Sequence, residues 1–344
     1  MHFFKVITAS MLWIVMQSVA IADFKPFQPL PAHPPVPSDN LMSPMKIKLG
    51  KQLFFDARLS KNKSMNCNSC HNVMAGGSSP QAKPTGAGGQ AGQRNAPTLW
   101  NVGFTTIYFL DGRATSLEAA IKEHLLADEA MAMEKESRVV DGVQQIPGYV
   151  KQFVALYGDE DPVNYDNISK SLAAYLRSLV TNDSAFDQYL RGNQNAISTA
   201  AKKGMEQFIE VGCASCHFWV NMAGPIPGLA FQMGEGFYEL FPNHLGSEYD
   251  ARYQLTDDVG RIKVTGEQYD RHMWRVASLR NIALTAPYFH NGAVGTLDEA
   301  VRVMAMAQYK KRLPEKTVEE ITAFLNTLTG NFPIQTMPRL PATQ

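Results

Sequence analysis

The chain has no excess of charge of either sign. Its 344 residues include 32 Lys and Arg against 32 Asp and Glu. Proteins that capture nucleic acid or anionic lipid through a general electrostatic field carry a cationic excess, so this balance argues against both roles. Apolar residues make up 45% of the chain, which excludes wholesale disorder. The length favours two domains rather than one.

Long apolar runs are also scarce. The main one is at the start, where the short basic segment Met1–Lys5 precedes an apolar stretch over Val6–Met16 and a small-x-small sequence at 20–22. This stretch is too short to span a bilayer and has the order of a cleavable export signal. A buried N-terminal helix is disfavoured because Asp23 and several prolines follow at once. We therefore expect residues 1–22 to be a signal peptide, and the mature protein to be periplasmic with no membrane span.

Cysteine is rare, with four residues in all. All four fall in two copies of the pattern C-x-x-C-H, at Cys67–His71 and Cys213–His217. In c-type haem attachment the two thiols bond to the porphyrin and the adjacent His ligates the iron. One copy would also suit a zinc or redox motif, but two copies in an exported chain with no other Cys favour haem. The sequence therefore predicts two covalent haems, the first held by Cys67, Cys70 and His71, the second by Cys213, Cys216 and His217.

Much of the sequence forms an internal repeat with a constant offset. Leu99-Trp100-Asn101 recurs 180 residues later as Leu279-Arg280-Asn281. Tyr108-Phe109 recurs at the same offset as Tyr288-Phe289, and a glycine follows in each copy. Such self-similarity indicates a duplicated structural unit.

Alternating patterns typical of strands are absent, whereas helical periodicity is clear near the end of each copy. Apolar residues recur at three- and four-residue steps over 168–179 and 318–328. We therefore expect an all-α fold with two cytochrome c-like domains, each carrying one covalently bound c-type haem, over 39–185 and 186–330, and a tail at 331–344. The segment 219–274 carries Gly, Pro and aromatics without periodicity, and its length favours a functional role.

Each haem iron needs a second axial ligand or an open position. Thr296 and the acids after it mark a helix start, and this helix carries Met304 and Met306. A His/Met pair raises the haem potential, although most Met residues simply fill cores. Subtracting the repeat offset from Met304 gives His124. Imidazole is both an iron ligand and a general base near neutral pH, so both roles stay open beside that of a surface His.

Several longer motifs resemble one known family. Besides the two haem motifs, they are LGKQLFFDARLS at Leu49–Ser60, RNAPT at Arg94–Thr98, DGR at Asp111–Arg113 and LRNIALTAPYFH at Leu279–His290. Together they resemble the bacterial di-haem cytochrome c peroxidase family, which includes MauG-like enzymes, over about residues 37 to 341. The resemblance favours Met304 over Met306 as the second-haem ligand.

The resemblance implies that the two haems have different roles. The C-terminal haem, with His217 and Met304, would take electrons from a small cytochrome c or copper protein. The N-terminal haem would meet hydrogen peroxide and reduce it to water. A calcium ion is also implied, bound by the side chain of Asn95 and the main-chain carbonyls of Thr285 and Pro287, since oxygen ligands suit this cation. The alternative is that Asn95 and Thr285 only satisfy turns. Many family members are homodimers.

The residues that differ from the family pattern lie around the first haem, where peroxide is expected to react. Members that need reductive activation carry a His in the Gly-rich loop, where this chain has Ala87. The Trp usually found between the haems is Leu110, and the distal position, commonly Pro, is His124. The usual catalytic acid is replaced by Ala130, which leaves Glu129 as the candidate acid.

Two functions follow from these changes. In the first, the iron is open, His124 is the base and Glu129 the acid, and peroxidase activity needs no reductive priming. In the second, His124 ligates the first haem, and the protein passes electrons or oxidises a protein substrate as MauG-like enzymes do. The sequence favours the first. A binding module that uses haem only as scaffold is the third and least favoured alternative.

Overall fold

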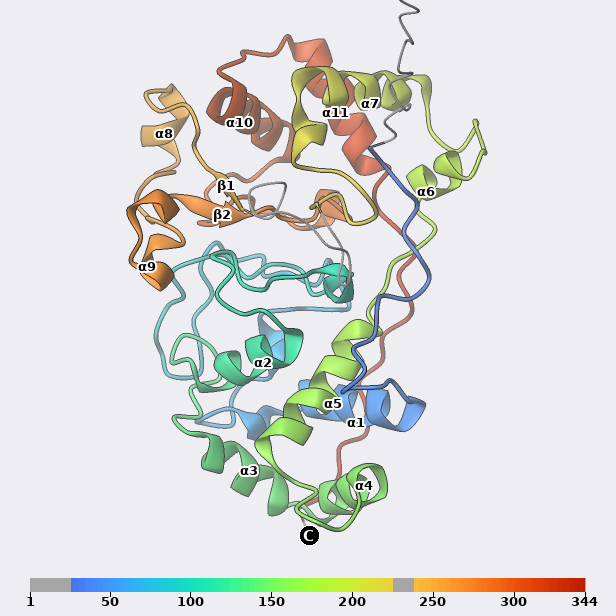
Figure 1. The fold of residues 1–344 in the computed structure, drawn as a ribbon, viewed down its shortest axis with the longest axis vertical. Helices are drawn as coiled ribbons and strands as arrows, with labels where there is room; N and C mark the ends of the chain where they lie inside the picture. Colours follow the sequence, from blue (N-terminus) through green and yellow to red (C-terminus); the bar gives the residue numbers. More distant parts are fainter. Residues whose placement is uncertain (1–25, 225–237, 344) are drawn as a thin grey trace, which may run out of the picture.

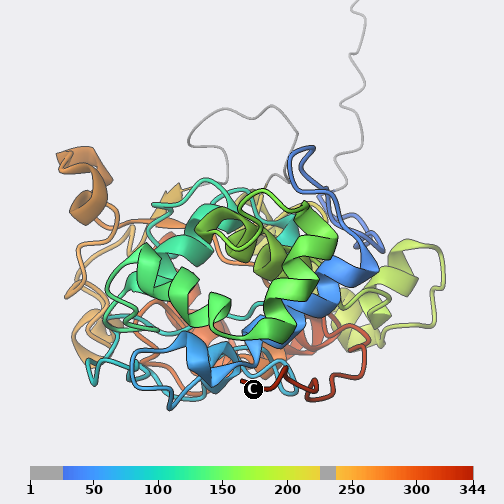
Figure 2. The same ribbon diagram turned by 90° about the horizontal axis from the view of Figure 1, so that it is seen from below.

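The computed structural model describes residues 26–224 and 238–343, so the expected signal peptide at 1–22 lies outside the described residues. The molecule consists of two largely helical halves arranged along its long axis (Figure 1), and Figure 2 shows it from the end of the first half. The expected helical class holds with one addition. Strands β1 (Tyr238–Leu240) and β2 (Met273–Arg275) form a small antiparallel sheet. Each has three residues, too few for alternation to be detected in the sequence. Within the described segments, no helix has the length and apolar character needed to cross a membrane.

The first half is built on a close crossing of two helices. Gly50 of α1 (Pro44–Phe54) packs directly against α5 (Tyr165–Arg177). A Cβ at residue 50 would lie 2.0 Å from the carbonyl oxygen of Ser171, so only glycine permits this approach. The remaining helices of this half are α2 (Leu117–Leu126), α3 (Glu136–Gln144) and α4 (Pro147–Tyr157).

The second half repeats this crossing. Gly204 of α7 (Thr199–Val211) packs against α11 (Glu315–Asn326), and a Cβ there would lie 1.8 Å from the carbonyl oxygen of Glu320. The other helices of this half are α6 (Ala185–Leu190), α8 (Glu248–Arg252), α9 (Ile262–Thr265) and α10 (Leu297–Tyr309). The two helices expected from periodicity, over 168–179 and 318–328, correspond to α5 and α11.

The 180-residue offset persists in the backbone. Asn101 and Asn281 both have a left-handed conformation, with φ of 63° and 61°. A short 3-10 helix follows each, over Val102–Phe104 and Ile282–Leu284. The helices α2 and α10 then begin at equivalent positions, at Leu117 and Leu297. The register therefore does not slip over this stretch, and His124 and Met304 lie at equivalent positions on equivalent helices.

Both ends of the described chain pack onto the body of the molecule (Figure 1). The Pro-rich lead-in enters the second half, where Phe27 joins the core beside Phe186 and Phe324. The tail runs to the first half, where Phe332 packs edge-on against Trp100 with ring centres 4.9 Å apart. The two halves are therefore linked by the lead-in, the connection before α6 and the tail. The boundaries expected for two domains, at 39–185 and 186–330, stay a prediction.

Candidate metal centres

The first C-x-x-C-H motif forms a tight turn that directs its histidine inward. Cys67–Ser69 make a 3-10 helix, and the buried His71 follows. The His71 Nδ1 lies 2.9 Å from the carbonyl oxygen of Pro97. A carbonyl only accepts hydrogen bonds, so Nδ1 carries the proton and Nε2 is left unprotonated. A metal-binding His is held in this way by a partner on its other nitrogen.

The second motif repeats this geometry. Cys213–Ser215 form a 3-10 helix, and His217 follows. Its Nδ1 lies 2.9 Å from the carbonyl oxygen of Met222. Here too Nε2 is left free to ligate a metal.

The residues around both motifs fit a covalently attached haem. No disulfide joins the four cysteines of the two motifs, so each sulfur is available for a thioether bond to a porphyrin. The indole Nε1 of Trp100 is buried without a hydrogen-bond partner in the described part of the chain. This ring lies beside Gly77, where a Cβ would come within 2.5 Å of it, near the loop that holds His71. An orphan donor in this place suits a bound group with acceptor atoms, such as a haem propionate.

His124 faces His71. The ring centres of these two side chains, from α2 and from the first motif, are 5.8 Å apart, with the ring planes at 57°. Burial is the main cause that lowers the pKa of His124 to about 3. The His124 ring is therefore neutral at pH 7, the form in which imidazole ligates metals.

Arg113 ties the helix of His124 to the turn before it. Its guanidinium pairs with Asp111 at 2.9 Å, pairs with Glu123, and lies over the ring of Phe109 at 3.6 Å. Since Glu123 precedes His124, this contact orders the distal side of the first site.

The long segment before β2 covers this same turn. Tyr238 of β1 donates a hydrogen bond to the carbonyl oxygen of Gly112 at 3.0 Å, and a Cβ at Gly112 would lie 2.3 Å from its ring. The guanidinium of Arg261 lies over the ring of Tyr238 at 4.2 Å. This contact between the halves gives the segment 219–274 a structural role, which no local pattern in its composition indicates.

Glu129 lies at the surface after α2. Its side chain is exposed and makes no hydrogen bond or ion pair within the described residues. The Gly-rich loop packs beneath its backbone, with the amide of Ala87 donating to the carbonyl oxygen of Ala130 at 2.7 Å. Ala87 is itself buried, at 7% exposure, in an ordered turn. The structure therefore brings His71 and His124 together but not Glu129.

At the second haem motif, the last turn of α10 contacts the motif. The hydroxyl of Tyr309 donates to the carbonyl oxygen of Gly212 at 2.6 Å and lies 3.0 Å from Oγ of Ser215. Met304 and Met306 lie earlier on this helix, and both are partly buried against one apolar cluster. Burial therefore does not separate the two methionines.

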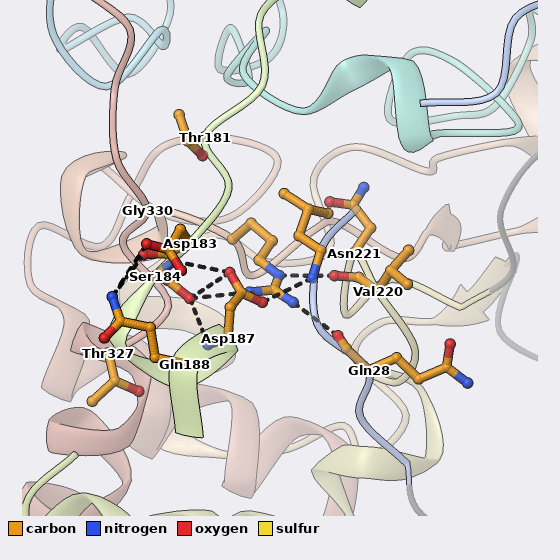
Figure 3. Close-up of polar contacts among 12 residues, drawn as sticks. Gln28, Thr181, Asp183, Ser184, Asp187, Gln188, Val220, Asn221, Thr327 and Gly330 are labelled. Atoms are coloured by element: carbon orange, nitrogen blue, oxygen red, sulfur yellow. Dashed lines mark hydrogen bonds and ion pairs between the residues drawn. The ribbon is translucent and has the colours of Figure 1, made fainter. Parts of the chain in front are cut away.

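A buried ion pair, to which the sequence assigned no role, holds the loop that orients His217. Arg280 and Asp187 are 1% and 0% exposed in their side chains and pair at 2.8 Å. Figure 3 shows Asp187 beside Ser184, whose hydroxyl donates a hydrogen bond to it. Arg280 also donates to the carbonyl oxygens of Val220, at 2.8 Å, and of Gln28, at 3.1 Å. Val220 lies two residues before Met222, the partner of His217. Arg280 was visible in the sequence only as part of a repeated motif.

Comparison with known proteins agrees with this duplicated geometry. Residues 44–195 match the family described as di-haem cytochrome c peroxidase. The cytochrome c551 peroxidase of Pseudomonas aeruginosa is 38% identical over 92% of this chain and 88% of its own length. The methylamine utilization protein MauG of Methylorubrum extorquens is 30% identical over 90% of this chain and 86% of its own length.

The chain belongs to the di-haem cytochrome c peroxidase and MauG family. It is a peroxidase-type oxidoreductase, and the family implies two haem c groups. The fold resembles the solved structure of a MauG-like protein associated with microbial copper homeostasis, with a TM-score of 0.75 at 26% identity over 90% of this chain and 95% of that one. The diheme peroxidase BthA of Burkholderia thailandensis shares the fold, with a TM-score of 0.66 at 19% identity over 88% and 91% of the two chains.

The three residues expected to bind calcium in this family lie on segments that meet. The amide of Asn95 donates to the carbonyl oxygen of His290 at 2.8 Å, and its side-chain nitrogen donates to that of Gln81 at 3.0 Å. The side-chain oxygen of Asn95 accepts no hydrogen bond within the described residues. Thr285 and Pro287 lie on the segment that leads to His290. A free amide oxygen beside this segment fits a hard cation.

Proposed function

We propose that this protein reduces hydrogen peroxide to water in the periplasm. The reaction would take place at the haem held by Cys67, Cys70 and His71. Electrons would come from a small donor protein through the haem held by Cys213, Cys216, His217 and Met304. Each peroxide consumes two electrons and two protons and yields two water molecules. Relatives named as cytochrome c peroxidases support the reaction, and the export signal expected at 1–22 supports the compartment.

The observation that carries the proposal is the separation of His71 and His124. An imidazole nitrogen lies about 2 Å from a metal that it ligates, so two rings on opposite sides of one metal have centres about 6 Å apart. The observed separation is 5.8 Å. A base acting on a peroxide bound to the iron would stand further away by at least one hydrogen bond, about 3 Å. The distance therefore supports the hypothesis that His124 would help to hold the haem iron together with His71, rather than act as a base at an open iron, the role that the sequence favoured.

We therefore propose a first site that His124 closes in the resting protein and that opens when this ring withdraws. Bound haem supplies the metal centre at which the peroxide bond is cleaved. His71 holds the proximal side through its bond to Pro97, and Arg113 sets the position of the helix that carries His124. After withdrawal the neutral His124 ring would be the nearest base for the proton of an incoming peroxide.

Cyanide binding tests this closed state. In the ferric holoprotein as isolated we expect slow cyanide binding at the first haem, and in His124→Ala binding at least tenfold faster. His244→Ala, which removes an exposed His of the second half, should behave as wild type. Prior reduction of the second haem should accelerate binding in the wild type. Equally fast binding in wild type and His124→Ala would show an open iron and overturn the closed site.

The proton donor is proposed as Glu129, the nearest carboxylate in sequence to the position where the family carries its acid. Proton transfer from a positioned side chain contributes about 10²–10⁴-fold to the rate. Glu129→Gln should therefore lower peroxide turnover by at least about 10²-fold. Glu160→Gln, a matched change at another exposed carboxylate, should not. Unchanged turnover in Glu129→Gln would remove this assignment.

Calcium binding by Asn95, Thr285 and Pro287 is proposed on the same family grounds. Removing calcium from the holoprotein with a chelator should lower its melting temperature, and added calcium should restore it. Asn95→Ala should lower the melting temperature and abolish the response to calcium. A chelator without effect on the wild type would argue against the site.

A further inference from the structure

The aromatic that this family usually places between its haems is absent here. Leu110 stands in that position, and its equivalent in the second half is His290. His290 is buried and stacks on the ring of Trp274, with ring centres 4.3 Å apart and planes at 20°. Leu110 packs into the same apolar cluster as Trp274. The aromatic surface near this position is therefore contributed by the second half.

The two halves meet here through equivalent residues. The amide of Asn95 donates to the carbonyl oxygen of His290 at 2.8 Å, and that of Arg275 donates to the carbonyl oxygen of Leu110 at 2.9 Å. Asn95 is equivalent to Arg275 in the repeat, and Leu110 is equivalent to His290. The two hydrogen bonds are therefore related by an approximate twofold axis between the halves. Arg94 and Trp274 are likewise equivalent positions, and they contact one another, with the guanidinium 4.8 Å from the ring centre.

This contact joins the loops that hold the two proximal histidines. Trp274 lies four residues before Ser278, whose hydroxyl donates to the carbonyl oxygen of Asn221 at 2.7 Å, next to Met222, the partner of His217. Arg94 lies three residues before Pro97, whose carbonyl oxygen accepts the hydrogen bond from His71. The ring of Trp274, which belongs to the loop of the second haem site, therefore contacts the side chain of Arg94, which belongs to the loop of the first.

We infer that Trp274 relays electrons between the two haem sites, in place of the aromatic missing at Leu110. The inference rests on the proposed function, in which peroxide removes electrons from the first site. Trp274 gives one electron to that site and regains one from the second, so its own oxidation state is unchanged over a cycle. Two such transfers supply the two electrons that each peroxide consumes.

The surroundings of Trp274 suit a transfer of the electron alone. Its buried indole Nε1 has no hydrogen-bond partner among the described residues, so no base takes its proton. The charge of Arg94 is compensated by ion pairs with Asp111 and, at 2.7 Å, with Asp258. Burial lowers the pKa of His290 to about 4, so the stacked imidazole adds no positive charge at neutral pH. The ring therefore rests against a neutral imidazole and a compensated ion-pair cluster.

The test compares Trp274→Phe with wild-type holoprotein containing two haems. Tyr249→Phe, which alters another aromatic of the same cluster, is the control. In a His124→Ala background, in which the first site is open, mixing ferric protein with peroxide and no donor should give a tryptophan radical in rapid-freeze EPR when residue 274 is Trp, with or without Tyr249→Phe, but not in Trp274→Phe. With the second haem reduced beforehand, its oxidation by peroxide should be at least tenfold slower in Trp274→Phe. The optical change of the first haem on reaction with peroxide should keep its wild-type rate.

Pulse radiolysis separates the relay from the proposed function, because it injects one electron and follows its passage between the haems without peroxide. This passage should also be at least tenfold slower in Trp274→Phe. If wild type fails to react with peroxide at the first haem, the proposed function is refuted and the radiolysis rates alone decide the relay. Equal inter-haem rates in Trp274→Phe and wild type, or the same radical with Trp or Phe at residue 274, would overturn the relay.

Discussion

Asn101 and Asn281 donate hydrogen bonds to the same atom. The side-chain amide of Asn101 lies 2.9 Å from Oγ1 of Thr181, and that of Asn281 lies 2.7 Å from it. The three side chains are buried, and the Thr181 amide donates back to the side-chain oxygen of Asn101 at 2.9 Å. The two asparagines are equivalent in the repeat, so one hydroxyl in the connection between the halves satisfies both copies.

Replacing this hydroxyl should destabilise the protein. In Thr181→Val both amides lose a buried acceptor, and an unsatisfied buried donor costs about 1–3 kcal/mol. We expect a loss of about 2–4 kcal/mol in the free energy of unfolding, measured by urea titration of the holoprotein. Thr322→Val is the matched control, because the Thr322 hydroxyl is buried without a partner among the described residues. That change should be neutral or slightly stabilising, and equal losses in the two variants would contradict the shared bond.

The two helix crossings depend on glycine. A Cβ at Gly204 would lie 1.8 Å from the carbonyl oxygen of Glu320, so Gly204→Ala must push α7 away from α11. Overpacking of this kind costs about 1–3 kcal/mol. Gly142→Ala is the control, since its nearest neighbour would be 4.0 Å away, and alanine in a helix is favoured over glycine by about 1 kcal/mol. Thermal unfolding should show a lower melting temperature for the first variant and an equal or higher one for the second.

Acid should weaken the contact between the halves through Asp258. Burial acts to raise the pKa of this carboxyl, but hydrogen bonds from Arg94 and from the amide of Gly260, with the charge of Arg94, hold its pKa well below the usual range. A depressed pKa adds stability that is present above the unfolded value, near 4, and is lost as the pH falls below it. Each unit of depression corresponds to about 1.4 kcal/mol.

We therefore expect the stability of wild type to fall more steeply than that of Asp258→Asn between about pH 5 and pH 2. Denaturant titrations of both proteins across this range measure the difference. Parallel curves for the two proteins would show that Asp258 has an ordinary pKa in the folded state.

The two methionines of α10 should differ in their effect on the second haem. If Met304 is the axial ligand, Met304→Ala lowers the reduction potential of that haem by on the order of 0.1 V or more, because a His/Met pair raises it. Met306→Ala should leave the potential unchanged. Redox titration followed optically at each haem gives both values. A drop in Met306→Ala alone would assign the ligand to the other methionine.

How much of the site was predictable differs from residue to residue. Cys67 and His71 lie four residues apart in one short motif, so the sequence alone indicates that they serve the same haem. The repeat alone predicts that His124 lies near His71, but whether His124 is a ligand or a base depends on the 5.8 Å separation of the rings, which no sequence pattern gives. Tyr238 could not be placed, because it lies in a segment without periodicity and contacts Gly112 in the other half.

The sequence by itself determined the two haem motifs, the repeat register that equates His124 with Met304, and the helices α5 and α11. These features depend on neighbouring residues and on hydrophobic periodicity. Only the tertiary structure decided that Arg94 lies on Trp274, that two asparagines share Thr181, and that Arg280 and Asp187 hold the loop before Met222. Such contacts join residues more than 50 positions apart, so they depend on how the two halves pack, which local propensity does not encode.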